Sequence, residues 1–353
     1  MSQLSTNHVK IVGVSACVPK TVEENIDLPL YESKEEVKKI IDSTGIERHR
    51  IVEKGTTASD LSIKAAEKIA ADLGWEMESV DLLLFVCTTR DYIQPMTSPT
   101  IQDRLGMRQD SYVMDLPLGC AGWVYGMSVA TALMTSGTIK RGLLVCAETN
   151  TQSHNLNDRT SRPLFGDAAT VTALEYDANY NHPMNYVFGV DGSGASAIMA
   201  QYGGFRNPVT PECLVEHEVE PGVFRKGTDI VLNGMDVFSF AIRRPPRSLK
   251  ELIEVFQINL EEIDFLFLHQ ANRYIDDRIR KSLKFPEEKT PYCLNDFGNV
   301  SGASIPLTMV TRTAKEIAGK ENHCLACGFG VGLSWASMEF FMENVKVSEL
   351  VEY

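Results

Sequence analysis

Three short stretches of the chain contain residues that could perform chemistry together. The first is "GCAG", in which Cys120 stands between small residues, directly before an apolar helical segment. A thiol at a helix N-terminus meets unpaired backbone N–H groups, which favour the thiolate, and small neighbours leave room for a ligand. An isolated cysteine is more often a small buried hydrophobe. This stretch alone therefore does not decide whether Cys120 is a nucleophile or a structural thiol.

The second and third stretches supply a histidine and an amide. His269 follows the apolar run "FLFL" and opens "HQAN", so we expect it at the carboxyl end of a buried strand, where α/β sheets place ligand sites. Asn299 lies in "FGNVSGAS", a small-residue turn before another helix, where an asparagine can also be a simple turn former. The other histidines stand in polar or loop-like segments and are expected to be non-catalytic: His8, His49, His154, His182, His217 and His323.

An internal repeat connects these stretches. "ESVDLLLFV" resembles "EEIDFLFLH" with Asp81 matching Asp264, an offset of 183 residues. "RGLLVCAET" resembles "ENHCLACGFG", where Leu143 matches Cys324 at an offset of 181 residues. The same offsets carry Cys120 onto residues 301–303, inside the turn of Asn299. The repeat predicts that the two turns meet at a junction, with Thr88, Thr89 and His269 close by.

The elements that must position these residues are those of an α/β protein. Short apolar runs such as "DLLLFV" and "DFLFLH" lack alternation, which is typical of strands covered on both faces. Helical stretches such as "DLSIKAAEKIAADLG" separate them. We expect two similar halves, residues 1–185 and 186–353, packed as one body without a linker.

Composition excludes several classes of protein. The 353 residues are 44% hydrophobic with a net charge of −13, which argues against nucleic acid or an anionic membrane as the main partner. No stretch approaches the roughly 18 apolar residues of a membrane span, and no signal peptide is recognisable, so we expect a cytoplasmic protein. Eight scattered cysteines indicate reduced thiols. Cys324 and Cys327 have metal-like spacing but read as part of a strand, and no metal is expected.

Two basic stretches could still serve an acidic partner, although most of their residues are expected on solvated helix faces. One is "AIRRPPRSLK", with Arg243, Arg244, Arg247 and Lys250. The other is "NRYIDDRIRKSLK", with Arg273, Arg278, Arg280, Lys281 and Lys284.

"GCAG", "HQAN" and "FGNVSGAS", in this order, resemble the Cys-His-Asn triad of beta-ketoacyl-acyl-carrier-protein synthase III, of the thiolase superfamily. Further likeness covers most of the chain, including "STGIERHRIV", "FGDAA" and "FGVGLSW". Thiolases carry a second cysteine, and elongating ketoacyl synthases a second histidine, where this chain has Asn299. The resemblance implies a duplicated five-layered α-β-α-β-α fold with two pseudo-twofold-related halves, and a homodimer.

The resemblance also implies a reaction. Cys120 would take an acyl group from acyl-coenzyme A, and malonyl-acyl carrier protein (or malonyl-coenzyme A) would then lose carbon dioxide and attack that group. His269 and Asn299 would donate hydrogen bonds to the enolate oxygen, and the backbone N–H groups of Cys120 and Val331 would hold the acyl oxyanion. Neither a metal nor a further cofactor is implied, because coenzyme A and the carrier's phosphopantetheine belong to the substrates.

Several positions depart from the family pattern. Arg159 matches a coenzyme A-binding arginine and Asn272 closes "HQAN", so both are expected to bind substrate, but Lys39 and Ser43 stand where many relatives have a nucleotide-stacking tryptophan. Gln94 replaces a phenylalanine that caps the partner subunit's acyl pocket, which indicates a primer other than acetyl. Tyr274 replaces a carrier-docking arginine, which leaves Arg273 and Arg278 as the expected docking cations.

Alternatives remain open within and outside the superfamily. A specialised synthase of polyketide, alkylquinolone or long-chain ketone type would share the same triad. A thioester hydrolase could use the same cysteine, histidine and asparagine without forming a carbon–carbon bond. A non-catalytic thiolase-fold partner would be expected to have lost Cys120, His269 or Asn299, and all three are present.

Overall fold

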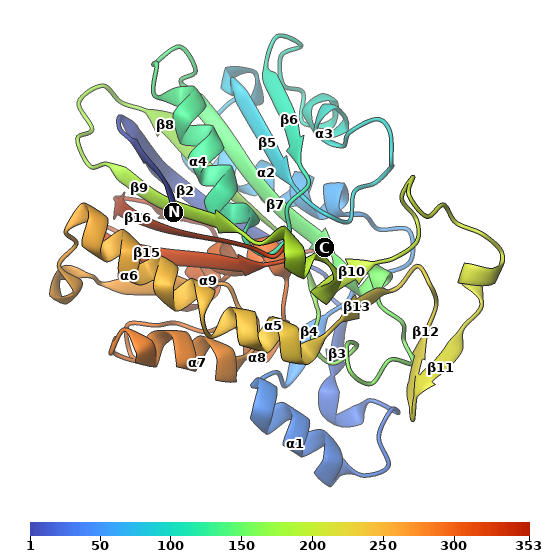
Figure 1. Cartoon of the computed structure of the whole chain (residues 1–353). Helices are drawn as coiled ribbons and strands as arrows, with labels where there is room; N and C mark the ends of the chain where they lie inside the picture. The colour runs from blue at the N-terminus through green and yellow to red at the C-terminus, as the bar shows by residue number, and fades with distance from the viewer.

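The computed structural model describes residues 1–353 and contains two large mixed sheets with helices between and outside them (Figure 1). The first sheet has the order β17-β2-β8-β7-β5-β6, with β18 also paired to β2. Its strands are β2 (Val9–Val18), β5 (Leu82–Val86), β6 (Tyr112–Leu116), β7 (Arg141–Thr149), β8 (Asp167–Tyr176), β17 (Lys346–Val347) and β18 (Val351–Glu352). The second sheet has the order β1-β9-β16-β15-β14. Its strands are β1 (Ser2–Thr6), β9 (Met184–Val190), β14 (Phe265–Leu268), β15 (Glu321–Gly330) and β16 (Ser334–Glu343).

The two sheets repeat one pattern, which confirms the duplicated fold. In the first, β5 runs parallel to β7, and β7 is antiparallel to β8. In the second, β14 runs parallel to β15, and β15 is antiparallel to β16. The strands that the repeat matched, β5 with β14 and β7 with β15, therefore occupy equivalent places.

The strands at each end of the chain pair with the sheet of the other half. Strand β1 pairs with β9 in the second sheet, whereas β17 and β18, at the other end of the chain, pair with β2 in the first. Strand β9 also begins at Met184, before the expected boundary. A boundary between residues 185 and 186 therefore does not assign each sheet to one half. Strand β1 of the first half forms an edge of the second sheet, and β17 and β18 of the second half pair with β2 in the first sheet.

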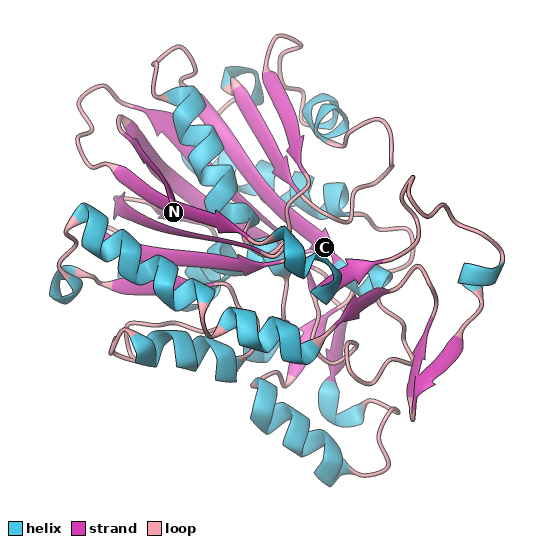
Figure 2. Cartoon of the chain, viewed as in Figure 1, coloured by secondary structure: helices cyan, strands magenta, loops and turns pink.

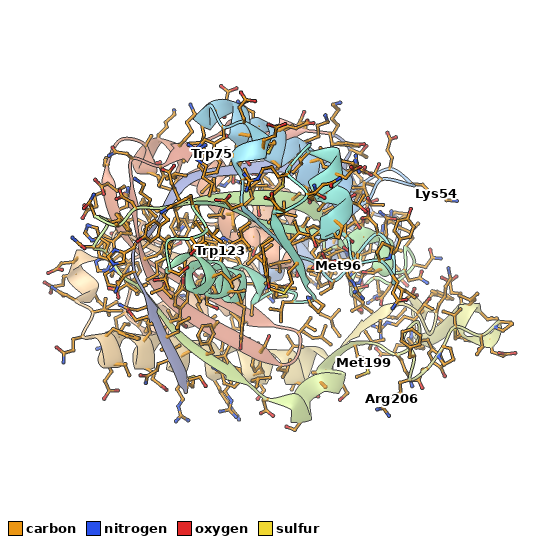
Figure 3. All side chains as sticks on the ribbon, turned by 90° about the horizontal axis from the view of Figure 1, so that it is seen from above. Lys54, Trp75, Met96, Trp123, Met199 and Arg206 are labelled. Atoms are coloured by element: carbon orange, nitrogen blue, oxygen red, sulfur yellow. The ribbon has the colours of Figure 1, made fainter.

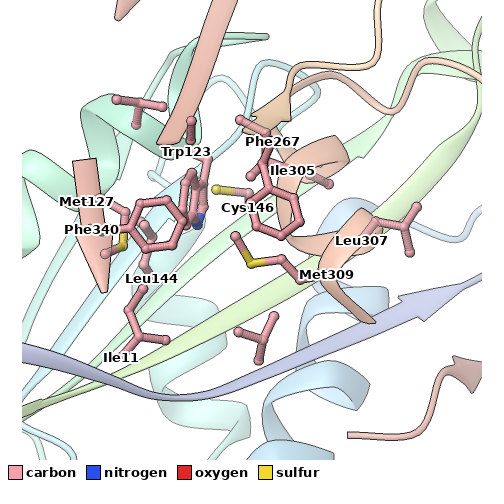
Figure 4. Close-up of a cluster of buried hydrophobic side chains, with 14 of the residues drawn as sticks. Ile11, Trp123, Met127, Leu144, Cys146, Phe267, Ile305, Leu307, Met309 and Phe340 are labelled. Carbon is pink, nitrogen blue, oxygen red and sulfur yellow. The ribbon is translucent and has the colours of Figure 1, made fainter. Parts of the chain in front are cut away.

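A central helical layer lies between the sheets and forms the largest core. It consists of α4 (Gly122–Met134) and α9 (Ser304–Arg312). Trp123 of α4 packs edge-to-face on Phe340 at 5.6 Å between ring centroids, and Phe340 contacts Phe267 of the second sheet at 6.5 Å (Figure 4). The Trp123 indole N–H also donates to the Thr172 hydroxyl at 3.0 Å. This layer therefore fixes both sheets to the segment that follows Cys120.

Outer helices complete five layers (Figure 2). The first sheet is covered by α2 (Ala58–Leu73), next to α3 (Ser98–Arg104), and the second by α6 (Arg244–Phe256) with α5 (Gly234–Ala241) and α7 (Arg273–Ser282). Helix α2 starts at a capping box between Thr57 and Asp60, which satisfies free N–H groups of its first turn. Shorter helices are α1 (Lys34–Thr44), α8 (Leu294–Phe297) and α10 (Ala314–Ile317). No helix has the length and apolar character that a membrane crossing requires.

Small two-stranded sheets lie outside the layers. They are formed by β3 (Val22–Glu24) with β4 (Arg48–Arg50), β10 (Ile198–Ala200) with β13 (Ile230–Leu232), and β11 (His217–Glu220) with β12 (Val223–Arg225). The segment that carries β11 and β12 projects from the layered body, with Arg206 at its periphery, whereas Trp123 lies in the interior (Figure 3). The β10–β13 and β11–β12 sheets supply residues to the cavity described below.

We predict that Trp123→Ala lowers the free energy of unfolding by about 3–5 kcal/mol, because it removes a fully buried ring from between the sheets. Leu156→Ala, at a side chain that is 62% exposed, should change it by less than about 0.5 kcal/mol. Urea unfolding followed by circular dichroism measures both. Equal effects of the two substitutions would contradict the assigned role of the central layer.

Candidate active site

Cys120 lies in the turn between β6 and α4, and the end of β15 packs directly against it. A Cβ atom at Gly330 would stand 2.7 Å from the Cys120 sulfur, and one at Gly328 would stand 2.8 Å from the Ala121 Cα. Both distances are too short for a side chain. The small residues around Cys120 therefore let the backbones of the two halves approach closely enough to share one site.

Ser301 is the residue that the second half places against Cys120. Its hydroxyl Oγ lies 3.7 Å from the Cys120 Sγ, and the two residues are 181 positions apart, within the range that the repeat predicts. Ser301 has a φ of 53°, a left-handed conformation that is uncommon outside glycine. The predicted meeting of the two turns is thus confirmed, and its contact residue is a serine that the sequence did not single out.

Ser301 also contacts the other two candidate catalytic residues. Its carbonyl oxygen lies 3.2 Å from His269 Nδ1, and its backbone N–H donates to Asn299 Oδ1 at 2.9 Å. One residue therefore contacts the thiol, the imidazole and the amide. No sequence signal beyond the repeat offset pointed to this role.

The hydrogen bonds of His269 define its protonation. Nδ1 lies 3.2 Å from the Ser301 carbonyl and 3.0 Å from the Ser304 hydroxyl, and that hydroxyl itself donates to the same carbonyl at 2.8 Å. A carbonyl oxygen can only accept, so Nδ1 carries the proton in this network. Burial lowers the pKa of His269 to about 4, so the ring is neutral at pH 7. Nε2 therefore offers a lone pair to the cavity.

Asn299 has a defined amide orientation. Its Oδ1 accepts from the Ser301 N–H, which leaves Nδ2 as the donor available to a ligand. Its backbone N–H donates to the Leu164 carbonyl at 2.8 Å, so the turn is anchored to the other half of the molecule. Asn299 is thus a donor in the resting protein, whereas His269 becomes a donor at Nε2 only after it gains a proton.

The thiol environment differs from the sequence expectation. Burial raises the pKa of Cys120 above its ordinary value, and hydrogen bonds from the Ser301 hydroxyl and the Val331 N–H offset only part of that effect. The position before α4 was expected to favour the thiolate, but removal of the thiol from water dominates. Cys120 therefore stays protonated at neutral pH and needs a base.

These residues line one cavity of about 550 Å³ at the junction of the halves. Of the sequence-predicted site residues, the cavity is lined by Cys120, His269, Asn299, Asn272, Val331 and Thr88. We call its buried end the part lined by the buried side chains of Asn150, His154 and Phe165, in the segment after β7, and its more exposed end the part lined by Asn272 and the start of α5.

Four predicted residues lie outside the cavity lining, namely Arg159, Gln94, Arg273 and Arg278. Arg159 forms an ion pair with Glu36 at 3.1 Å and lies over the Tyr31 ring at 5.8 Å. Gln94 is exposed on the segment between β5 and α3.

Arg273 and Arg278 lie on α7 and differ in whether neighbouring acids neutralise their charge. Arg273 forms ion pairs with Glu287 and Asp277 and lies 3.8 Å over the Tyr292 ring. Arg278 is exposed and donates to the Tyr274 hydroxyl at 2.6 Å. Of the two, Arg278 presents the freer charge.

Glu148 is a functional candidate that sequence analysis missed. It is 1% exposed, and its carboxylate accepts hydrogen bonds from the backbone N–H and the hydroxyl of both Thr88 and Thr89, at 2.7–3.0 Å. Burial raises its pKa to about 7. This contact holds the loop after β5, including the predicted neighbour Thr88, against the cavity. A single acid at the end of the apolar run "GLLVCAE" was the available signal.

Potential metal ligands lie far from this site. The ligand atoms of His182, Glu321 and Glu343 lie within 4.8 Å of one another at the start of β15, opposite the end that packs against Cys120. Cys324 and Cys327 are both buried within β15, as the strand interpretation predicted.

Comparisons with known proteins agree with this geometry. Residues 114–192 match the model of 3-oxoacyl-[acyl-carrier-protein] synthase III, and residues 253–340 match the model of its C-terminal part. The chain is 32% identical over 333 residues to the beta-ketoacyl-[acyl-carrier-protein] synthase III of Roseiflexus sp. strain RS-1, covering 94% of this chain and 97% of that protein. The chain belongs to this family. It is therefore an acyltransferase of the condensing-enzyme type.

Solved structures of the family share the fold along the whole chain. The 3-oxoacyl-(acyl-carrier protein) synthase of Burkholderia xenovorans LB400 superposes with a TM-score of 0.93 at 29% identity, covering 100% of this chain and 99% of that one. The priming beta-ketosynthase of the R1128 polyketide pathway superposes with a TM-score of 0.83 at 25% identity, covering 96% and 97%. These matches confirm the predicted thiolase-like architecture.

We predict that iodoacetamide alkylates Cys120 of the unloaded enzyme at a rate that still rises above about pH 8.5, the midpoint of a free thiol. The reason is that burial stabilises the protonated thiol, while iodoacetamide reacts with the thiolate. Intact-protein mass spectrometry against pH measures the rate, with Cys120→Ala identifying the labelled site. A plateau below about pH 7.5 would show that the thiolate already dominates.

Proposed function

We propose that Cys120 takes an acyl group from acyl-coenzyme A and passes it to the carbanion formed when malonyl-acyl carrier protein loses carbon dioxide. The observation that carries this proposal is the arrangement around Ser301. A protonated thiol, a neutral imidazole with a free lone pair and a fixed amide donor line one cavity in a chain of this family.

In the first half-reaction, the Cys120 thiol gives its proton to His269 Nε2 as Sγ attacks the acyl carbonyl. The backbone N–H groups of Cys120 and Val331 hold the oxyanion that forms. The Val331 N–H already lies against Sγ, which supports this role. The bond from the carbonyl to coenzyme A breaks, coenzyme A leaves as its thiolate, and His269 keeps the proton.

In the second half-reaction, the malonyl carboxylate leaves as carbon dioxide and its bonding electrons form an enolate. Asn299 Nδ2 and the newly protonated His269 Nε2 donate hydrogen bonds to the enolate oxygen. The carbanion attacks the acyl carbonyl, the bond to Sγ breaks, and the Cys120 thiolate recovers its proton from His269. This scheme gives His269 two successive tasks, whereas Asn299 serves only the second half-reaction.

The substrates enter from the more exposed end of the cavity in this proposal. Asn272 lines that end, and its side chain caps α7 by accepting from the Ile275 N–H at 2.9 Å, so it is held in place. Arg159 binds the nucleotide part of coenzyme A at the surface, beside Tyr31. Arg278, with Arg273 behind it, meets the acidic carrier protein. The reaction needs no metal and no cofactor besides these thioesters.

A homodimer completes the site in this proposal. Strand β6 forms an edge of the first sheet and carries Tyr112, which is 45% exposed, so it can pair with a second copy. The neighbouring loop exposes Tyr92, Ile93 and Met96 around Gln94. Burial of these side chains by a second copy would place Gln94 at the partner's acyl pocket. We expect such a dimer in the cytoplasm.

A specialised synthase is the alternative within the family. The polyketide priming ketosynthase shows that a chain with this fold and 25% identity carries out priming in a pathway other than fatty acid synthesis. It would use the same residues, so it differs from the main proposal in its primer and pathway rather than in its chemistry.

We predict that Asn299→Ala still forms the acyl-enzyme but condenses roughly 10²–10³ times more slowly, because it loses a donor that acts only on the enolate. Cys120→Ala should form no acyl-enzyme at all. Intact-protein mass spectrometry follows acylation, and release of labelled carbon dioxide from malonyl thioester follows condensation. Acylation of Cys120→Ala, or equal loss of both half-reactions in Asn299→Ala, would contradict the assigned roles.

A further inference from the structure

The buried end of the cavity contains two polar side chains that the reaction does not use. Asn150 is 4% exposed and His154 is 8% exposed, and both line the same cavity as Cys120. The Asn150 Nδ2 has no hydrogen-bond partner in the protein, and neither do Nδ1 and Nε2 of His154. Buried polar groups are normally paired, so two unpaired groups beside one cavity indicate that a ligand pairs them.

Their neighbours show that this lack of partners is local. Thr160, which also lines the cavity, donates to Asp158 at 2.5 Å and accepts from Arg225 at 3.0 Å. Arg225 in turn pairs with Asp158 at 2.6 Å. These polar groups satisfy one another, whereas the Asn150 Nδ2 and the His154 ring nitrogens bond to none of them. The nearby charges of Asp158, Asp229 and Arg225 act on the His154 ring without a hydrogen bond to it, and the Phe165 ring stacks on the imidazole at 4.1 Å.

The position of the two side chains assigns them to the acyl group rather than to coenzyme A. Asn150 and His154 belong to the segment that follows β7 and are buried in the cavity lining, whereas Asn272 is more exposed. In the proposed function the thioester enters from the side of Asn272. Burial lowers the pKa of His154 to about 4, so its ring is neutral and offers one donor and one acceptor. Asn150 adds an amide donor.

We propose that the acyl group loaded on Cys120 carries an uncharged hydrogen-bonding group, most simply a hydroxyl, that pairs with Asn150 and His154. A hydroxyl both donates and accepts, which matches this pair, whereas a carboxylate would bring a buried charge that no free cation here neutralises. The inference rests on the proposed acyl transfer and names its substrate class. The exposed Gln94 plays no part in it.

The test compares matched acyl-coenzyme A pairs on the whole enzyme. Butyryl is paired with 3-hydroxybutyryl, and hexanoyl with 6-hydroxyhexanoyl, and the rate of mass addition to Cys120 is measured for each. We expect at least one hydroxylated ester to load about tenfold faster than its unsubstituted partner, because the latter leaves the buried groups unpaired. Asn150→Leu should abolish or reverse that preference, and His154→Phe, which keeps the stack on Phe165, should weaken it.

Gln152→Leu is the matched control, because it makes the same kind of change on the same turn at an exposed side chain. It should leave the preference unchanged. Faster loading of the unsubstituted ester in both pairs would overturn the inference, as would an unaltered preference in Asn150→Leu and His154→Phe. Both of those results leave acyl transfer itself intact. Failure of every ester to load would instead overturn the proposed function, and the inference with it.

Discussion

The contact between Cys120 and Ser301 is the constraint on which the rest of the site depends. These residues occupy equivalent turns of the two halves, and their side chains meet at 3.7 Å. Such an approach requires that nothing larger than glycine stand at Gly328 and Gly330, and that the central helices hold both sheets at a fixed separation. The backbone of Ser301 then orients His269 and Asn299, so one turn sets the positions of both catalytic side chains of the second half.

Burial at this junction of the two halves decides the protonation of the site. Withdrawal of the thiol and the imidazole from water raises the pKa of one and lowers that of the other, so both are neutral before substrate arrives. A neutral pair costs less to bury than an ion pair and still allows the proton to pass from sulfur to nitrogen as the acyl group binds. Burial acts in the same direction on Glu148, whose pKa it raises to about 7, and the donors from Thr88 and Thr89 offset only part of that rise.

Sequence reasoning found the parts of the site that the repeat and the strand ends define. His269 follows a strand whose apolar run is visible, Cys120 stands among small residues before an apolar helical segment, and the offset of the repeat led to the turn that meets Cys120. Ser301 was missed because its role depends on its backbone, and a serine in a small-residue turn has no distinct signal. The thiolate expectation failed because a helix position is visible in the sequence, whereas the depth of burial depends on both halves together.

Asn150 and His154 could not be recognised from sequence for a related reason. "NTQSHNLND" reads as a polar loop, and polar loops are normally solvated. Only the folded chain shows that this loop turns inward behind Phe165. Sheet edges were also hard to foresee, because β1, β17 and β18 are short strands paired with partners far away in the chain.

The two halves contribute different parts of the site. The proton acceptor and the amide donor come from the second half, on a strand end and a turn that are tied to the sulfur through Ser301. The residues that surround the buried end come largely from the segment after β7. Its Leu164 carbonyl accepts from the Asn299 backbone N–H. By contrast, the Asn150 Nδ2 and the two ring nitrogens of His154 form no hydrogen bond with His269 or Asn299. A change of side chain at Asn150 or His154 can therefore alter which acyl group fits without moving the atoms that transfer it.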